Sequence, residues 1–112
     1  MKKIILDTDF ILHCVRAKID IKEELNRILY FPFEICILDK TLDELKGKKD
    51  EKLARETIKN FKILKTEKGK VDDLLLKQEG IIATTDKALK EKLKKSKKGI
   101  IVLRQKKFLQ LI

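Results

Sequence analysis

Short apolar runs recur along the chain and alternate with segments in which the apolar residues follow a helical period. Each run is rich in isoleucine and leucine, which is typical of strands that are buried on both faces of a sheet. The runs with this character are residues 2–6, 34–38, 61–64, 81–84 and 100–103. They predict a sheet of four to five strands, depending on whether 61–64 joins it.

The segments between the runs have apolar residues three or four positions apart, the spacing that lines one face of an α-helix. Pro32 ends one of these segments because proline cannot continue a helix. The segments predicted to be helical are residues 10–15, 21–29, 41–46, 53–61, 72–78 and 87–97. Strands that alternate with helices favour an α/β domain with a mostly parallel sheet.

The chain of 112 residues has the length of one domain and contains no repeat or low-complexity linker, so we expect a single domain over 1–112. No apolar stretch approaches the roughly 20 residues that a membrane span requires. The N-terminus also lacks the apolar region of a signal peptide. These features predict a soluble protein of the cytoplasm.

Acidic residues gather where the predicted strands end. Open parallel sheets build their ligand sites at the carboxyl ends of their strands. Some of these acidic residues directly follow a strand, and the others lie in helices that begin or end at the same edge. The acidic residues expected along this edge are Asp7, Asp9, Glu44, Asp72, Asp73 and Asp86.

Taken one at a time, these side chains have an ordinary structural explanation. Aspartate is a favoured helix N-cap and stabilises a helix by about 0.5–2 kcal/mol. Glu44 lies in a first helical turn, where the helix dipole favours an acid. The aspartates that precede predicted helices, and could cap them, are Asp7, Asp9, Asp72 and Asp86.

Taken together, the same carboxylates indicate a cation site. Converging carboxylates raise one another's pKa, and a divalent cation relieves that repulsion. Zinc is not favoured because Cys14 and Cys36 are far apart, without a Cys-x-x-Cys pair, and His13 is the only histidine; both cysteines are expected as buried thiols. Oxygen ligands are those that Mg²⁺ or Mn²⁺ prefers. Such an ion suits phosphodiester cleavage, and no glycine-rich phosphate loop or serine-nucleophile motif competes with this interpretation.

The formal net charge of +10 is concentrated at one end of the chain. Residues 87–112 contain ten basic residues and one acidic residue, whereas residues 1–86 contain 18 basic and 17 acidic residues. A basic segment of this density is typical of proteins that bind a polyanion such as nucleic acid. The alternative is a solvated, lysine-rich helix face that only confers solubility, and charge alone favours neither.

Four segments, in order, resemble the motifs of the PIN domain family. These are ILDTDFIL (5–12), LDKTLDELKG (38–47), KVDDLLL (70–76) and IIATTDKALKEKL (81–93). The ending KGIIVLRQKKFLQLI is similar to that of the PIN subgroup related to the ribosomal small-subunit processing endonucleases. The resemblance covers essentially the whole chain and implies a three-layer α/β/α fold around a central, mostly parallel sheet of four to five strands.

Many PIN domains are Mg²⁺- or Mn²⁺-dependent ribonucleases, so the resemblance implies a set of catalytic residues. Carried over motif by motif, the catalytic and metal-binding carboxylates are Asp7, Glu44, Asp72 and Asp86. Asp73 is the alternative to Asp72 as the third ligand. Leu75, three residues after Asp72, favours Asp72.

Two threonines and one departure complete the implied site. Thr8 and Thr84 occupy the hydroxyl positions that support the site in the family. Asp9 stands where the family usually has asparagine, an added charge that can either bind metal or weaken the site. The residues expected to hold RNA phosphates lie in the basic segment and are Lys87, Lys90, Lys94, Lys97 and Arg104.

The leading hypothesis is a Mg²⁺- or Mn²⁺-dependent endoribonuclease that hydrolyses RNA in ribosomal RNA processing or another maturation step. One alternative is a PIN-like RNA- or ribosome-binding protein with weak or no activity, which Asp9 and a KVDDLLL-to-TTD interval about one helical turn short would explain. Another is a VapC-type ribonuclease toxin with an antitoxin partner. RNA is the expected partner, a membrane is not, and the resemblance makes a homodimer a further expectation.

Overall fold

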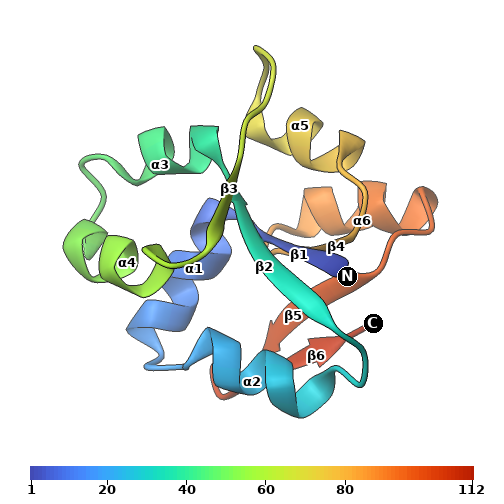
Figure 1. Cartoon of the computed structure of the whole chain (residues 1–112), viewed down its shortest axis with the longest axis horizontal. Helices are drawn as coiled ribbons and strands as arrows, with labels where there is room; N and C mark the ends of the chain where they lie inside the picture. Colours follow the sequence, from blue (N-terminus) through green and yellow to red (C-terminus); the bar gives the residue numbers. More distant parts are fainter.

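A sheet crosses the middle of the molecule and carries helices on both faces (Figure 1). The computed structural model describes all residues, 1–112. The strands are β1 (Lys2–Leu6), β2 (Phe33–Leu38), β3 (Lys62–Leu64), β4 (Ile81–Ala83), β5 (Ile100–Arg104) and β6 (Phe108–Leu111). The helices are α1 (Thr8–Arg16), α2 (Ile21–Ile28), α3 (Asp39–Leu45), α4 (Glu51–Ile58), α5 (Val71–Lys77) and α6 (Lys87–Lys95). None of these helices has the length and apolar character needed to cross a membrane.

The strand order is β3-β2-β1-β4-β5-β6, which places β1 and β4 side by side in the centre. Neighbouring strands from β3 to β5 run parallel, and β6 runs antiparallel to β5. Chain connections leave β1 toward β2 on one side, whereas β4 and β5 extend the sheet on the other. The carboxyl ends of β1 and β4 therefore flank the point at which the direction of winding reverses, where α/β sheets bind ligands.

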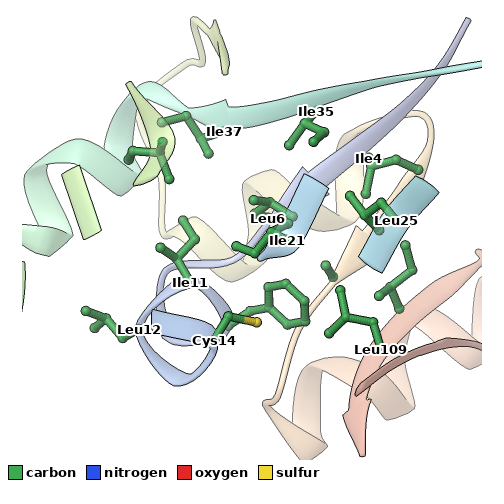
Figure 2. Close-up of a cluster of buried hydrophobic side chains, with 14 of the residues drawn as sticks. Ile4, Leu6, Ile11, Leu12, Cys14, Ile21, Leu25, Ile35, Ile37 and Leu109 are labelled. Atoms are coloured by element: carbon green, nitrogen blue, oxygen red, sulfur yellow. The ribbon is translucent and has the colours of Figure 1, made fainter. Parts of the chain in front are cut away.

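The alternation of side chains along each strand divides the core into two clusters. Ile4 and Leu6 face α1, α2 and α4 within a cluster of 18 buried residues (Figure 2), whereas Ile5 faces α5 and α6 within a cluster of 11. One free, buried cysteine lies in each cluster, Cys14 in the first and Cys36 in the second. The expected three-layer α/β/α fold with a mostly parallel sheet and the buried thiols are thus confirmed.

The sheet has six strands rather than the predicted four to five. The additional strand is β6, which pairs with β5 through a tight turn in which Gln105 and Lys106 adopt φ values of 52° and 54°. The turn is closed by a 2.9 Å hydrogen bond from the Lys107 N–H to the Arg104 carbonyl. Two-residue turns of this left-handed type are usually marked by asparagine or glycine. Their absence here explains why the sequence pattern did not predict the hairpin.

The two outer edges of the sheet differ in how their backbone groups are bonded. On β6, the Leu109 N–H donates to Glu24 of α2 at 2.9 Å, and the Leu109 carbonyl accepts from Arg27 at 3.3 Å. Glu24 and Arg27 also pair with each other at 2.8 Å. On the opposite edge, β3 pairs with β2 and has no strand on its other side. The β6 edge is therefore covered by side chains at Leu109, and the β3 edge is open.

Candidate functional site

A polar cleft of about 320 Å³ lies at the carboxyl ends of β1 and β4. Its lining contains no hydrophobic residue and comes from α1, α3, α5, the start of α6 and the loop after α3. The residues that line it are Asp7, Thr8, Asp9, Glu44, Lys48, Asp72 and Asp86. The structure therefore brings together side chains from all four motifs singled out in the sequence.

Asp7 is the most buried of the cleft carboxylates and is only 6% exposed. It links β1 to α1, and its Oδ1 accepts a 2.8 Å hydrogen bond from the Thr8 N–H. Its Oδ2 accepts a 2.9 Å bond from the Thr84 hydroxyl, so both carboxylate oxygens are oriented. Burial raises the pKa of Asp7 to about 6, and the charges of Asp72 and Asp9 add to the rise against the lowering effect of these hydrogen bonds.

Thr84 connects the two central strands at the cleft floor and is fully buried. Its hydroxyl donates to Asp7 and accepts a 3.1 Å bond from the Asp86 N–H, while its own N–H donates to the Ile101 carbonyl at 3.1 Å. Asp86 in turn caps α6, with Oδ1 accepting from the Leu89 N–H at 3.1 Å. A single hydroxyl therefore sets the positions of two of the predicted catalytic carboxylates.

Glu44 reaches the cleft from α3 and is held by Thr8. The Thr8 hydroxyl donates to Glu44 Oε1 at 2.5 Å, which joins the first turn of α1 to a residue 36 positions away. Thr8 is buried, whereas Glu44 is exposed. Thr8 and Thr84, the two hydroxyls expected to support the site, are thus both bonded to predicted ligands.

Adjacent aspartates of α5 lie in different surroundings. Asp72 lines the cleft and is half-buried, and burial, followed by the charge of Asp86, raises its pKa. Asp73 is exposed and lies outside the lining. Of the two residues between which the sequence left the choice open, the structure places Asp72 with the other carboxylates.

The N-cap interpretation holds for two of the four aspartates to which it was applied. Asp7 and Asp86 cap α1 and α6 and also line the cleft, so capping and a role in the site are compatible. Asp9 lies in the first turn of α1, and the N-cap of α5 is Lys70 rather than Asp72. The capping prediction for Asp9 and Asp72 was therefore wrong, because each helix begins one or two residues earlier than the pattern indicated.

The donor set of the cleft fits a hard divalent cation in its chemistry. All of its potential ligands are carboxylate or hydroxyl oxygens, which Mg²⁺ and Mn²⁺ prefer, and no cysteine or histidine lines it. Burial is the main cause that raises the pKa of Asp7 and Asp72, and neighbouring carboxylates add to the rise of each; this added repulsion is what a cation would relieve. No three acidic, histidine or cysteine side chains are already close enough to ligate one ion. Binding would therefore require side-chain rotation, for which the exposed Glu44 and Asp9 have room.

The basic residues expected to bind RNA lie mainly away from the cleft. Helix α6 begins at the cleft with Asp86 and extends about 13 Å from it over its length. Lys97 follows the far end of the helix and lies beside Lys2 at the amino ends of the strands. Arg104 is engaged with Gln110 at 2.8 Å. None of the five predicted RNA-binding residues lines the cleft. These residues are Lys87, Lys90, Lys94, Lys97 and Arg104.

Two lysines outside the predicted set lie nearer to the acidic residues, one by its electrostatic effect on Asp72 and one in the cleft lining. Lys92 lowers the pKa of Asp72, so it lies on the flank of α6 that faces α5. Lys90 and Lys94 are about 160–200° around the helix from Lys92 and occupy the other flank. Lys48 lines the cleft itself. No sequence signal distinguished it, because it lies in a loop with several other lysines.

Comparison with known proteins gives a consistent assignment. Residues 4–106 match the family model described as a PIN like domain. Ribonuclease VapC4 of Methanocaldococcus jannaschii is 35% identical over 127 aligned positions, which cover 99% of this chain and 97% of that protein. The solved structure of the PIN domain endonuclease Utp24 superposes with a TM-score of 0.83 at 28% identity, covering 97% of this chain and 90% of that one. On the basis of this match along nearly its whole length, the chain belongs to the PIN-like domain family.

Proposed function

We propose that the protein is a divalent-metal-dependent endoribonuclease that hydrolyses RNA phosphodiester bonds in the cleft between β1 and β4. The observation that carries the proposal is the gathering of Asp7, Glu44, Asp72 and Asp86 around hydroxyl groups that orient them. Its relatives are consistent with it, since one is named a ribonuclease and the other an endonuclease.

Mg²⁺ or Mn²⁺ would be held by Asp7, Glu44 and Asp86, with Asp72 beside them. When bound, the ion would neutralise charge on the phosphate and lower the pKa of a water molecule. The chain's own contribution is orientation. Thr84 fixes Asp7 and the backbone of Asp86, and Thr8 draws Glu44 toward the first turn of α1. With a pKa of about 6, Asp7 is mostly ionised at neutral pH and available as a ligand.

The proposal is tested by replacing adjacent aspartates of α5 one at a time. Asp72→Asn removes a cleft carboxylate and is expected to lower the single-turnover cleavage rate of a single-stranded RNA by about 100-fold or more. Asp73→Asn is the matched control, because it changes the same charge outside the cleft, and it should stay within about twofold of the original rate. Cleavage by the unmodified protein should require Mg²⁺ or Mn²⁺ and stop with EDTA.

A second readout is independent of activity. Calorimetric titration with Mn²⁺ should show weaker binding for Asp72→Asn and Asp7→Asn than for Asp73→Asn. The proposal would be contradicted by cleavage that persists in EDTA, or by trace activity that is identical in the unmodified protein and Asp7→Asn. Circular dichroism of each variant establishes that the fold is retained.

A second candidate function is RNA binding without cleavage, which the additional charge of Asp9 in the cleft favours. It predicts RNA binding that is salt-sensitive and unaffected by EDTA, with no cleavage under any metal. Restoring asparagine at this position, Asp9→Asn, distinguishes the two. If Asp9 only weakens an active site, the variant gains activity; if the protein is a binding module, the variant stays inactive.

The biological RNA is a further part of the proposal. A role in ribosomal RNA maturation and a role as a toxin use the same cleft and differ in substrate and partner. Cleavage of precursor ribosomal RNA at one position would support the first. Inhibition of RNA cleavage by the protein product of a small neighbouring gene, acting as an antitoxin, would support the second. Size-exclusion chromatography with light scattering tests the proposed homodimer, and cell fractionation tests the proposed cytoplasmic location.

A further inference from the structure

Lys48 is the only basic side chain among the residues that line the cleft. It faces a lining with five carboxylates, those of Asp7, Asp9, Glu44, Asp72 and Asp86. Lys48 is exposed and forms no ion pair with any of them within 4.0 Å. The ammonium group is therefore available to a ligand that enters the cleft.

The backbone of Lys48 is held on both sides by hydrogen bonds. Its N–H donates to the Leu45 carbonyl at 3.1 Å, and its carbonyl accepts from the Glu51 N–H at 3.1 Å. The preceding residue, Gly47, has a φ of 77° and donates its N–H to Glu51 Oε1 at 2.9 Å. Position 48 is thus fixed at the turn between α3 and α4, while its long side chain is free to move.

The same loop is tied to the helix that carries the first motif. Arg16, at the end of α1, donates to Asp50 at 3.1 Å and to the Lys49 carbonyl at 3.2 Å. The loop contains two other lysines, Lys46 and Lys49, and both are exposed without lining the cleft. The position of Lys48 is therefore not a general property of a lysine-rich loop.

The charge of the cleft explains what this ammonium could bind. An RNA phosphate that approaches five carboxylates is repelled, and the lysines of α6 that were expected to hold it extend away from the site. Lysine binds phosphate as a point charge on a flexible stem, which does not require a fixed approach geometry. Lys48 is the one cation among the residues that line the cleft, so it is placed to offset this repulsion for a phosphate inside it.

We propose that Lys48 binds the RNA phosphate at which cleavage occurs and draws it into the acidic cleft. The inference rests on the proposed function and extends it by naming the residue that recognises the substrate's backbone. Because the contact is with phosphate and not with a base, it contributes affinity and rate without sequence preference.

The test compares Lys48→Met with Lys49→Met, which remove the same charge from neighbouring positions. In single-turnover cleavage of a single-stranded RNA with Mn²⁺, Lys48→Met should be slower by about tenfold or more, since one charged contact to the reacting group is lost. Lys48→Arg should keep most of the rate, and Lys49→Met should stay within about twofold of the unmodified protein. All three variants should unfold at the original midpoint, because the Lys48 side chain forms no bond that stabilises the fold.

RNA affinity provides a readout that does not depend on turnover. Fluorescence anisotropy of the same RNA is measured against salt concentration in proteins that also carry Asp7→Asn. Loss of one phosphate contact should reduce the slope of log K against log salt by about 0.7 for Lys48→Met. The slope for Lys49→Met should be unchanged.

The outcomes separate this inference from the proposed function. If the unmodified protein cleaves RNA and the two lysine variants behave alike in rate and slope, the inference is wrong and the nuclease proposal stands. If no protein cleaves RNA but only Lys48→Met loses slope, the nuclease proposal fails and the phosphate contact stands.

Discussion

The two walls of the cleft are built differently. The wall formed by Asp7 and Asp86 is bonded through the hydroxyl of Thr84, which is buried beneath it. The opposite wall, with Glu44 and Lys48, is exposed, and its one side-chain bond to the cleft is the contact between Thr8 and Glu44. The difference indicates that the first wall fixes where a ligand binds, and the second wall adjusts once the ligand is present.

The fixed wall has a cost in stability that depends on pH. The pKa of Asp7 in the folded protein is about 6, against 3.8 for the unperturbed group. A raised pKa means that the folded state binds the proton more tightly, so the stabilisation is present below pH 4 and is lost as the pH rises through 6. With about 1.4 kcal/mol per pKa unit, the folded protein loses about 3 kcal/mol from this group between pH 4 and pH 7.

The largest expected effect in the comparison therefore comes from Asp7→Asn. Asparagine does not ionise, so this variant lacks the destabilisation that a buried carboxylate causes. Its free energy of unfolding relative to the original protein should therefore rise by about 3 kcal/mol between pH 4 and pH 7. Urea unfolding of both proteins across this range measures the difference. Parallel pH profiles would show that Asp7 is not destabilised by its burial. The same variant is expected to lose cleavage, so stability and activity would change in opposite directions.

A smaller effect is expected from Thr84→Val, which keeps the side-chain shape and removes the hydroxyl. Asp7 loses a donor and the Asp86 N–H loses its acceptor, so the free energy of unfolding should fall by about 2 kcal/mol. The pKa of Asp7 should rise further, because the lost hydrogen bond lowers it. The pH dependence of cleavage should shift upward by the same cause.

Thr85→Val is the control for this substitution. Thr85 is the next residue and also bears a bonded hydroxyl, which contacts His13 Nδ1 at 3.0 Å on the exposed side. Its loss should cost less than about 1 kcal/mol and leave the pH profile unchanged. If Thr84→Val and Thr85→Val changed the free energy of unfolding and the pH profile equally, the buried Thr84 hydroxyl would have no special role.

The smallest effect on stability is expected in the adjustable wall. Thr8→Val removes the hydroxyl that holds Glu44, and because Glu44 is exposed its carboxylate regains water. The free energy of unfolding should fall by less than about 1 kcal/mol. The concentration of Mn²⁺ needed for half-maximal cleavage should nevertheless rise several-fold, since Glu44 is no longer oriented. A stability loss as large as that of Thr84→Val would show that both walls are fixed.

The alternation of apolar runs was sufficient to predict the fold class, and the motif order placed Asp7, Glu44 and Asp86 at one edge. Leu75 favoured Asp72 over Asp73, and Asp72 is the one of the two that lines the cleft. Which of the two side chains faces the cleft depends on where α5 starts. The N-cap of α5 is Lys70, which makes no side-chain capping bond and so gives no sequence signal for that start. The additional strand β6 was missed for a related reason, because its turn uses glutamine and lysine where the common signal is asparagine or glycine.

Charge was the least reliable guide to the site. The excess of lysine at the end of the chain is real, but its placement depends on the direction in which α6 runs. That helix starts at the cleft and carries its lysines toward the opposite end of the strands. Lys48, one of several lysines in the loop after α3, lies in the cleft because Gly47 turns the chain and Glu51 holds the turn. The density of lysine along the sequence therefore did not predict which lysine lines the cleft.

The unequal edges of the sheet limit how copies of the chain can associate through their strands. The ion pair of α2 occupies the backbone groups of Leu109 on β6, so a further strand would have to displace both side chains. On β3 no side-chain bond occupies the outer backbone groups, so a strand can pair there without breaking one. A filament grows by joining one free edge to another on each copy, and a molecule with a single free edge stops at a pair. The ion pair between Glu24 and Arg27 thus hinders extension of the sheet beyond β6 at Leu109 and favours association through β3, independently of the chemistry of the cleft.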